Sequence, residues 1–306
     1  MKPTVILICA LTNGKIAFDY FYNLHKKEKI NLLKVYTYKD NIAPNKNMLF
    51  PLDDIVPSIL LTKVEHINYN KKEIIEINPD FIFVVGWSQL INKEIVNASK
   101  NGTIGFHSAK LPKDRGRSTI AWQIAEGYTE TALTMFYLSE GIDDGDIIAQ
   151  EIIKIKQNDY VKDIIYKMNK STINILKAYF PLLIKGKAPR IKQDEKQANY
   201  RRLRNSVEDC SIDWNQNTKD IYNHIRAVSY PYPKAWTLYK GKEIRINKAN
   251  IMDYVFEGFY CFENPGTILG NIKGYGYLIK TKNGVIAIND FDKKDIFLST
   301  GEILGE

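Results

Sequence analysis

The first 127 residues alternate short apolar runs with amphipathic segments, and this alternation limits the fold more than any other feature. Four runs are expected to be strands, at 4–11, 30–38, 81–87 and 102–108. Apolar residues recur at helical spacing in four segments between and after them, at 15–28, 71–78, 92–100 and 118–127. The run FIFVVGW is apolar at nearly every position, as in parallel strands that helices cover on both faces. The pattern predicts a doubly wound, Rossmann-like α/β domain.

The chain changes character after a long amphipathic segment at 160–186, which we expect to be a helix. A polar, charged stretch follows, and then one short helical segment and several strand-like runs separated by Gly, Asn and Asp. Short strands with such turns are typical of a small barrel, and 306 residues suggest about two domains. The sequence therefore predicts an α/β domain over 1–190, a linker over 191–208 and a C-terminal OB-like barrel over 209–306.

Charge is distributed unevenly along the chain. The net charge is +8, yet residues 207–306 hold 12 Lys and Arg against 13 Asp and Glu, which leaves 31 basic and 22 acidic residues in 1–206. A surface that binds nucleic acid neutralises several phosphates and needs a basic excess. The near-neutral C-terminal part therefore argues against a nucleic-acid partner.

The three cysteines, Cys9, Cys210 and Cys261, lie far apart and lack metal-ligand or redox spacing. With an otherwise ordinary composition, they indicate reduced thiols in a cytoplasmic protein that has no metal site. No apolar run approaches about 20 residues, so we expect no membrane-spanning helix. The apolar start of the chain reads as a first strand rather than a signal peptide. The sequence leaves a homodimer open.

Two ionisable residues lie where expected strands end. His107 ends the strand 102–108, and Asp143 lies in the loop between two further expected strands, 132–139 and 146–155, which we expect to be partly antiparallel. The carboxyl ends of parallel strands meet at one edge of the sheet, where ligands of open α/β sheets bind. A carboxylate beside an imidazole fixes its tautomer for acid–base chemistry. We therefore expect His107 and Asp143 to be the catalytic pair.

The residues around this pair resemble a known family. HSAKLPKDRGRSTIAWQIAEG (107–127) and ETALTMFYLSEGIDDGDIIAQ (130–150) are similar to the patterns N-x-H-x-S-L-L-P-x-x-R-G and E-G-[LI]-D-x-G-x-[IL] of the 10-formyltetrahydrofolate-dependent formyltransferases. Residues 211–246 and 265–269 resemble the C-terminal barrel of methionyl-tRNA and sugar-nucleotide formyltransferases. The resemblance implies that 1–190 is the catalytic domain, that 10-formyltetrahydrofolate is the cosubstrate, and that an amine receives the formyl group.

The resemblance also implies roles for individual residues. His107 would stabilise the oxyanion that forms during transfer and supply a proton. Alignment on E-G-x-D-x-G makes Asp143 the functional carboxylate. The folate ring would lie against residues of two loops, Gly86, Trp87, Leu90, Ile142 and Asp144. Residues after the His107 strand would face an anionic acceptor, namely Ser108, Lys110, Arg115 and Arg117.

The position two residues before His107 departs from the family pattern in a way that bears on catalysis. Gly105 stands two residues before His107, where the pattern has an Asn that donates a hydrogen bond to the formyl oxygen. Loss of one such donor costs about a hundred- to a thousandfold in rate. Either another donor or a water replaces it, or the enzyme is slow, or the chain is a non-catalytic relative that binds folate or a nucleotide.

We expect the acceptor to be the amine of a nucleotide-linked amino-deoxysugar, as in surface-glycan or lipopolysaccharide biosynthesis. The segment YRRLRNSVEDCSIDW (200–214) resembles the arginine-rich linker of such sugar enzymes. The early loop DNIAPNKNMLFPLDD (40–54) holds one Lys and three Asp and lacks the basic insertion with which tRNA enzymes bind the acceptor stem. Methionyl-tRNA is the alternative acceptor.

Overall fold

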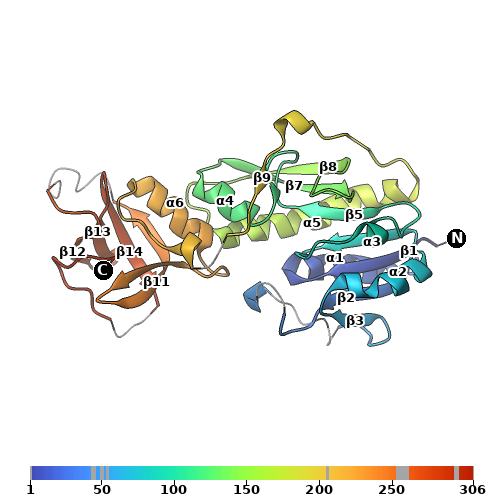
Figure 1. Cartoon of the computed structure of the whole chain (residues 1–306), viewed down its shortest axis with the longest axis horizontal. Coiled ribbons are helices and arrows are strands. Elements are labelled where there is room, and N and C mark those ends of the chain that lie inside the picture. Colours follow the sequence, from blue (N-terminus) through green and yellow to red (C-terminus); the bar gives the residue numbers. More distant parts are fainter. Residues whose placement is uncertain are drawn as a thin grey trace. The chain divides into compact units, whose positions relative to one another are not determined.

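The computed structural model describes residues 2–42, 46–48, 52, 55–204, 207–252, 262–292 and 296–305. The chain forms two compact units, each made of several segments (Figure 1). Unit 1 comprises Met1–Thr119, Glu130–Lys154 and Ile165–Arg202, and unit 2 comprises Ile120–Thr129, Ile155–Ile164 and Leu203–Glu306. Two short segments from within 1–190 thus belong to unit 2. The domain boundaries 1–190, 191–208 and 209–306 stay a prediction.

Unit 1 is built on a seven-stranded sheet with the order β3-β2-β1-β4-β5-β7-β8. The first five strands in this order run parallel, β7 pairs antiparallel with β5, and β8 pairs antiparallel with β7. The strands are β1 (Thr4–Cys9), β2 (Asn31–Tyr38), β3 (Leu61–Val64), β4 (Phe81–Val85), β5 (Thr103–His107), β7 (Glu130–Tyr137) and β8 (Ile147–Lys154). The expected mixture of parallel and antiparallel strands is confirmed.

Strand β4 shows why this sheet needs apolar residues at successive positions. On one face, the ring of Phe83 lies 4.5 Å from that of Phe21 in α1 and 5.6 Å from that of Phe180 in α5. On the other face, Val84 belongs to a buried cluster with Ile95 of α3. Successive side chains of a strand point to opposite faces, so a strand covered by helices on both sides is apolar throughout. The helices are α1 (Leu11–Lys26), α2 (Lys71–Ile77), α3 (Lys93–Val96), α4 (Thr119–Ala125) and α5 (Val161–Ile184).

Two short structures were not predicted from the sequence. The edge strand β3 has three half-buried residues out of four and shows no clear alternation. The second is a two-stranded parallel pair formed by β6 (Arg115–Gly116) and β9 (Tyr200–Arg201), with Arg115 opposite Tyr200. The pair of β6 and β9 connects the loop after His107 to the stretch predicted as a linker, and it therefore lies close to the expected site.

Unit 2 contains helix α6 (Thr218–Val228) and a five-stranded antiparallel sheet with the order β10-β11-β14-β13-β12 (Figure 1). Its core is aliphatic, with Ile244, Ile279 and Ile286 fully buried. The strands are β10 (Ala235–Tyr239), β11 (Lys242–Ile251), β12 (Ile268–Ile272), β13 (Gly276–Lys280) and β14 (Val285–Phe291). The prediction of a Rossmann-like α/β domain followed by a small barrel-like domain is confirmed.

Cys9 and Cys210 are buried thiols outside any disulfide, and burial raises the pKa of both. The third, Cys261, lies outside the described residues. Within the described ranges, no helix combines the length and the apolar content that crossing a bilayer requires.

Candidate active site

The end of strand β5 brings His107 into a nearly closed polar environment. The residue is 8% exposed, and its Nε2 donates to the backbone oxygen of Asp114 over 2.6 Å. Its Nδ1 lies 3.5 Å from Oδ2 of Asp143. Both ring nitrogens therefore face oxygen acceptors, so a doubly protonated ring has a partner on each side.

Asp143 is held from two directions. Its Oδ2 accepts a hydrogen bond from the backbone N–H of Gly116 at 2.8 Å, in addition to facing His107. Its backbone has φ 52°, in the left-handed region that residues other than glycine adopt only uncommonly. Asp114, whose carbonyl binds His107, has φ 56°. The two residues that contact the imidazole thus both have strained backbones, a feature that clusters at functional sites.

The structure gives Arg115 a different environment from the one expected. Its side chain is fully buried, and its Nη2 lies 2.6 Å from Oε1 of Glu195. It also donates to Oε1 of Gln193 and to the hydroxyl of Tyr200, at 2.9 Å and 3.0 Å. The hydrogen bond with Glu195 raises the pKa of Arg115 and lowers that of Glu195. Because these donors are occupied inside unit 1, Arg115 could bind an anionic acceptor only by releasing one of these bonds, and that role stays a prediction.

The other residues expected near the acceptor remain at the surface or contribute backbone. Lys110 is exposed, with its Nζ 3.3 Å from Oε1 of Glu130. Ser108 accepts a hydrogen bond at its carbonyl from the Thr119 hydroxyl. Arg117 is exposed, and its backbone N–H donates to the carbonyl of Arg201. A role in acceptor binding stays a prediction for Ser108, Lys110 and Arg117.

The expected folate-facing residues lie at the ends of β4 and β7, where apolar side chains are exposed. Leu90 is 72% exposed and Ile142 is 45% exposed. Trp87 stacks on Tyr38 with ring centroids 3.8 Å apart, and its indole N–H is buried without a partner among the described residues. Gly86 has φ 68°, and a Cβ there would collide with the carbonyl oxygen of Ala10.

Asp144 faces a different partner from its neighbour. Its Oδ1 accepts a hydrogen bond from the Ser139 hydroxyl within the same turn. Asp143 instead faces His107. Exposed apolar side chains suit the faces of a flat heterocycle, but the assignment of the residues at the ends of β4 and β7 to folate stays a prediction.

The space beside Gly105 is occupied. A Cβ at this position would lie 2.8 Å from Cδ2 of Leu138 and 3.2 Å from the ring of Phe136. An Asn side chain would fit here only if Leu138 moved. The departure at Gly105 is therefore matched by packing around it, and this local packing supplies no side-chain donor in place of the Asn.

Sequence reasoning missed the residues that hold the site together. Asn199 and Arg201 bind the carboxylate of Asp114, with Nε of Arg201 at 2.6 Å from Oδ1. Gln193 donates to the carbonyls of Asp143 and Gly145, both at 2.8 Å. These residues lie in a polar stretch with no periodicity, so no local signal marked them.

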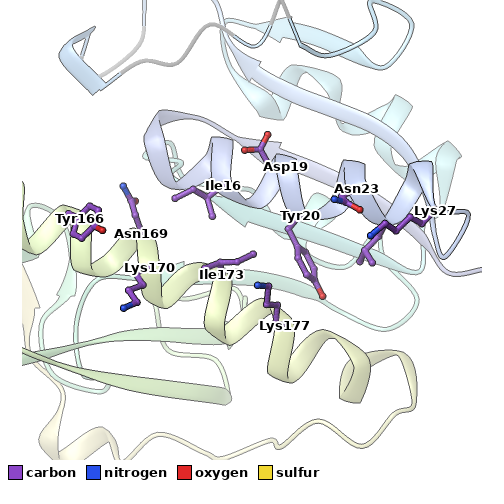
Figure 2. Close-up of a pocket in the computed structure, with 11 residues that line it drawn as sticks. Ile16, Asp19, Tyr20, Asn23, Lys27, Tyr166, Asn169, Lys170, Ile173 and Lys177 are labelled. Atoms are coloured by element: carbon purple, nitrogen blue, oxygen red, sulfur yellow. The ribbon is translucent and has the colours of Figure 1, made fainter.

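A separate cavity of about 750 Å³ lies between α1 and α5 in unit 1 (Figure 2). Figure 2 shows Tyr20 and Asn23 of α1 facing Ile173 and Lys177 of α5 across it. None of the residues predicted for the site lines this cavity. The cavity therefore adds nothing to the arrangement around His107.

The arrangement around His107 suits acyl transfer. An imidazole flanked by a fixed carboxylate can stabilise an oxyanion and move a proton. Two family models match the chain: "Formyl transferase" over residues 11–178, and "Formyl transferase, C-terminal domain" over residues 205–297.

Several related sequences are named for methionyl-tRNA as the acceptor. A methionyl-tRNA formyltransferase of Fusobacterium nucleatum is 28% identical over 270 residues, which cover 87% of this chain and 85% of that protein. Methionyl-tRNA formyltransferases of Bacillus species are 30% to 31% identical, and the match spans 55% to 65% of their length.

Two of the solved structures with a similar fold are named for a sugar acceptor, and another is a methionyl-tRNA formyltransferase of Clostridium thermocellum. WlaRD, a sugar 3N-formyl transferase crystallised with dTDP and 5-N-formyl-THF, has a TM-score of 0.67 at 19% identity, covering 94% of this chain and 97% of that chain. An N-formyltransferase of Helicobacter canadensis, in complex with folinic acid and dTDP-3-aminofucose, has a TM-score of 0.66 at 18% identity, covering 94% and 99%. At these identities the likeness establishes the fold. Because the first family model covers more than half of the residues and the second matches the C-terminal part, the chain belongs to the formyl transferase family.

Proposed function

We propose that this protein transfers a formyl group from 10-formyltetrahydrofolate to the primary amine of a nucleotide-linked amino-deoxysugar. The observation that carries the chemistry is the His107–Asp143 pair, with Nδ1 3.5 Å from Oδ2 and the carboxylate fixed by the Gly116 N–H. The exposed apolar side chains of Leu90 and Ile142 suit the faces of a bound pterin ring. Folate compounds in the two solved relatives support the same cosubstrate.

The reaction forms one C–N bond and breaks another. The folate supplies the formyl carbon, which the amine nitrogen attacks. In this step the Nε2–H of His107 leaves the Asp114 carbonyl, which accepts it in this structure, and donates to the oxygen that gains negative charge. Asp143 stabilises the positive charge of the ring and fixes its orientation. The amine loses a proton and the departing folate nitrogen gains one, so the balance needs no further reactant.

The sugar acceptor is supported by charge. The C-terminal 100 residues carry 12 basic against 13 acidic side chains, whereas the excess of basic residues lies in 1–206. A sugar nucleotide presents one diphosphate, which a few Arg and Lys side chains bind. The nucleotide and the amino sugar named for the two solved relatives agree with this acceptor class.

Methionyl-tRNA is the second candidate acceptor, and the sequence relatives favour it. A tRNA-binding surface neutralises several phosphates, so its affinity falls steeply with salt. A third candidate, a slow or non-catalytic relative, is favoured by Gly105, because glycine has no side-chain donor and its neighbours Leu138 and Phe136 supply none.

A competition assay separates the three candidates. The protein is given 10-formyltetrahydrofolate with equal concentrations of a dTDP-linked amino-deoxysugar and initiator methionyl-tRNA, and the products are measured by mass. We expect the formylated sugar to dominate at all salt concentrations. Formylated methionyl-tRNA that declines sharply between low and moderate salt would establish the second candidate. Folate binding by calorimetry without either product would establish the third.

A further inference from the structure

The polar stretch 193–201, here called the clamp segment, contacts both residues that bind the His107 ring. Gln193 donates from Nε2 to the backbone oxygen of Asp143 and to that of Gly145. Further along, Asn199 accepts from the backbone N–H of Asp114 at 2.8 Å. A segment that lies 85 residues from Asp114 and 50 residues from Asp143 in sequence thus reaches both loops.

Gln193 is the central residue of the clamp segment because every donor and acceptor of its side-chain amide is hydrogen bonded. Its Oε1 accepts from Nε and Nη2 of Arg115, at 3.2 Å and 2.9 Å. Its Nε2 makes the two bonds to the Asp143 loop, both 2.8 Å long. An amide has two donor hydrogens and an oxygen with two acceptor sites, so each is occupied. Arg115 is in turn fixed by both carboxylate oxygens of Glu195.

The backbone that Gln193 binds is strained. Asp143 has φ 52°, a conformation in which the Cβ crowds the following peptide. Such a residue keeps this conformation only where its surroundings over-determine it. The Gly116 N–H fixes the carboxylate of Asp143 and Gln193 fixes its carbonyl, so the two bonds together set the angle at which the carboxylate faces His107.

We infer that Gln193 is a positioning residue for formyl transfer, and that it acts by transmitting the fixed position of Arg115 to Asp143. This inference rests on the proposed function and adds a residue from outside the His107 and Asp143 loops to the working site. It also assigns a role to Arg115, whose donors are turned to Gln193, Glu195 and Tyr200.

The substitution Gln193→Glu removes the hydrogen bonds that Gln193 donates and keeps those that it accepts. A carboxylate still accepts from Arg115 but has no hydrogen to donate, and its oxygen faces the two carbonyls of the Asp143 loop. The matched control is Gln197→Glu in the same segment, because the Gln197 side chain is exposed and donates to Asp194 instead. We expect kcat of Gln193→Glu to fall on the order of tenfold to a hundredfold, as a displacement of about 1 Å at a reacting group implies. Gln197→Glu should keep the wild-type kcat.

A double-mutant cycle separates positioning from general damage. If Gln193 acts through Asp143, the substitution Gln193→Glu should lower kcat by less than about threefold in an Asp143→Asn background, because residues that act as a unit are not additive. A full additional loss in that background overturns the inference. So does a kcat of Gln193→Glu equal to that of the wild type. Gln193→Ala, which removes the amide without adding charge, repeats the cycle if the first variant does not fold.

Hydrogen exchange tests the same inference without turnover. Backbone amides of residues 139–146 should exchange faster in Gln193→Glu than in the wild type, whereas those of β1 and β4 should not change. Gln197→Glu should match the wild type throughout. Unchanged exchange in 139–146 overturns the positioning role even if the acceptor is wrong. A wild-type protein that formylates neither acceptor, but whose 139–146 amides respond to Gln193→Glu, contradicts the proposed function alone.

Discussion

Two arginines are buried in this protein, one in each unit, and they are held in different ways. Arg115 in unit 1 is fully buried and pairs with the carboxylate of Glu195, which raises its pKa. Arg226 in unit 2 is 3% exposed, and its hydrogen bonds go to amide and carbonyl oxygens, including Oδ1 of Asn223 at 2.6 Å. Burial lowers the pKa of Arg226.

The comparison teaches that a buried arginine by itself does not mark a functional site. Each guanidinium ties distant segments together, as a rigid fork with five donors does well. Arg226 joins α6 to the backbone oxygens of Lys156 and Asp159, and none of the residues predicted for the site lies on those segments. Arg115 is joined through Gln193 to the loop that carries Asp143. We therefore expect damage near Arg115 to affect turnover and damage near Arg226 to affect stability.

The largest effect should come from the residue at the centre of the unit 1 network. His107→Asn should lower turnover by at least about a hundredfold, because it removes the positioned proton donor. The matched control is His66→Asn, since His66 lies at the start of a short turn and contacts Asn68. Steady-state formylation of the two purified variants provides the measurement. A folded His107→Asn variant with near wild-type rates would show that the network around His107 and Arg115 is not the catalytic one.

The next effect distinguishes two neighbouring carboxylates. Asp143→Asn should lower turnover on the order of tenfold to a hundredfold, because the amide no longer balances the charge of the ring. Asp144→Asn should be mild, since Asp144 faces Ser139 rather than His107. Both thermal midpoints should stay close to that of the wild type. The reverse ranking in kcat would move the functional position to Asp144.

In unit 2 we expect a loss of stability instead. Arg226→Met should lower the free energy of unfolding by about 3 kcal/mol, because buried carbonyls lose their donor. Arg245→Met is the control, since Arg245 is a partly exposed arginine of the same unit that pairs with Glu243. Urea unfolding gives the free energies, and the kcat per folded molecule of Arg226→Met should be unchanged. A loss of kcat in Arg226→Met without a loss of stability would contradict the expected difference between the two arginines.

The smallest effect concerns a histidine of unit 2. Burial, with the nearby charge of Arg204 adding to it, lowers the pKa of His224 to about 4. The unfolded chain, with an ordinary pKa near 6.5, binds a proton first as the pH falls. Stability is therefore fully present above about pH 6.5 and declines towards pH 4, by about 2 kcal/mol between pH 7 and pH 5.

The variant His224→Gln should remove this part of the pH dependence without changing turnover at pH 7. Urea unfolding at pH 7 and pH 5, for wild type and variant, provides the comparison. An equal decline in both proteins would show that other groups cause it and that the His224 ring is not kept neutral by burial.

The sequence by itself determined the layers of the fold. FIFVV at 81–85 predicts a strand covered on both faces, and the structure places Phe83 against helices on one face and Val84 in the cluster on the other. Because burial selects apolar residues in a pattern that extends over only a few neighbouring positions, strands and helices can be predicted from the local sequence. The positions of His107 and Asp143 were likewise expected, because both lie next to strands, and the structure brings their side chains within 3.5 Å.

Only the tertiary structure decided what Arg115 and the clamp segment do. An arginine in a polar loop has the same local pattern whether it faces solvent or a buried carboxylate, so Arg115 was expected at the acceptor. Gln193 was read as part of a linker because its partners lie about 50 and 78 residues earlier in the chain. Hydrogen bonds between such distant residues depend on the pairing of β6 with β9, and two-residue strands leave no periodicity in the sequence.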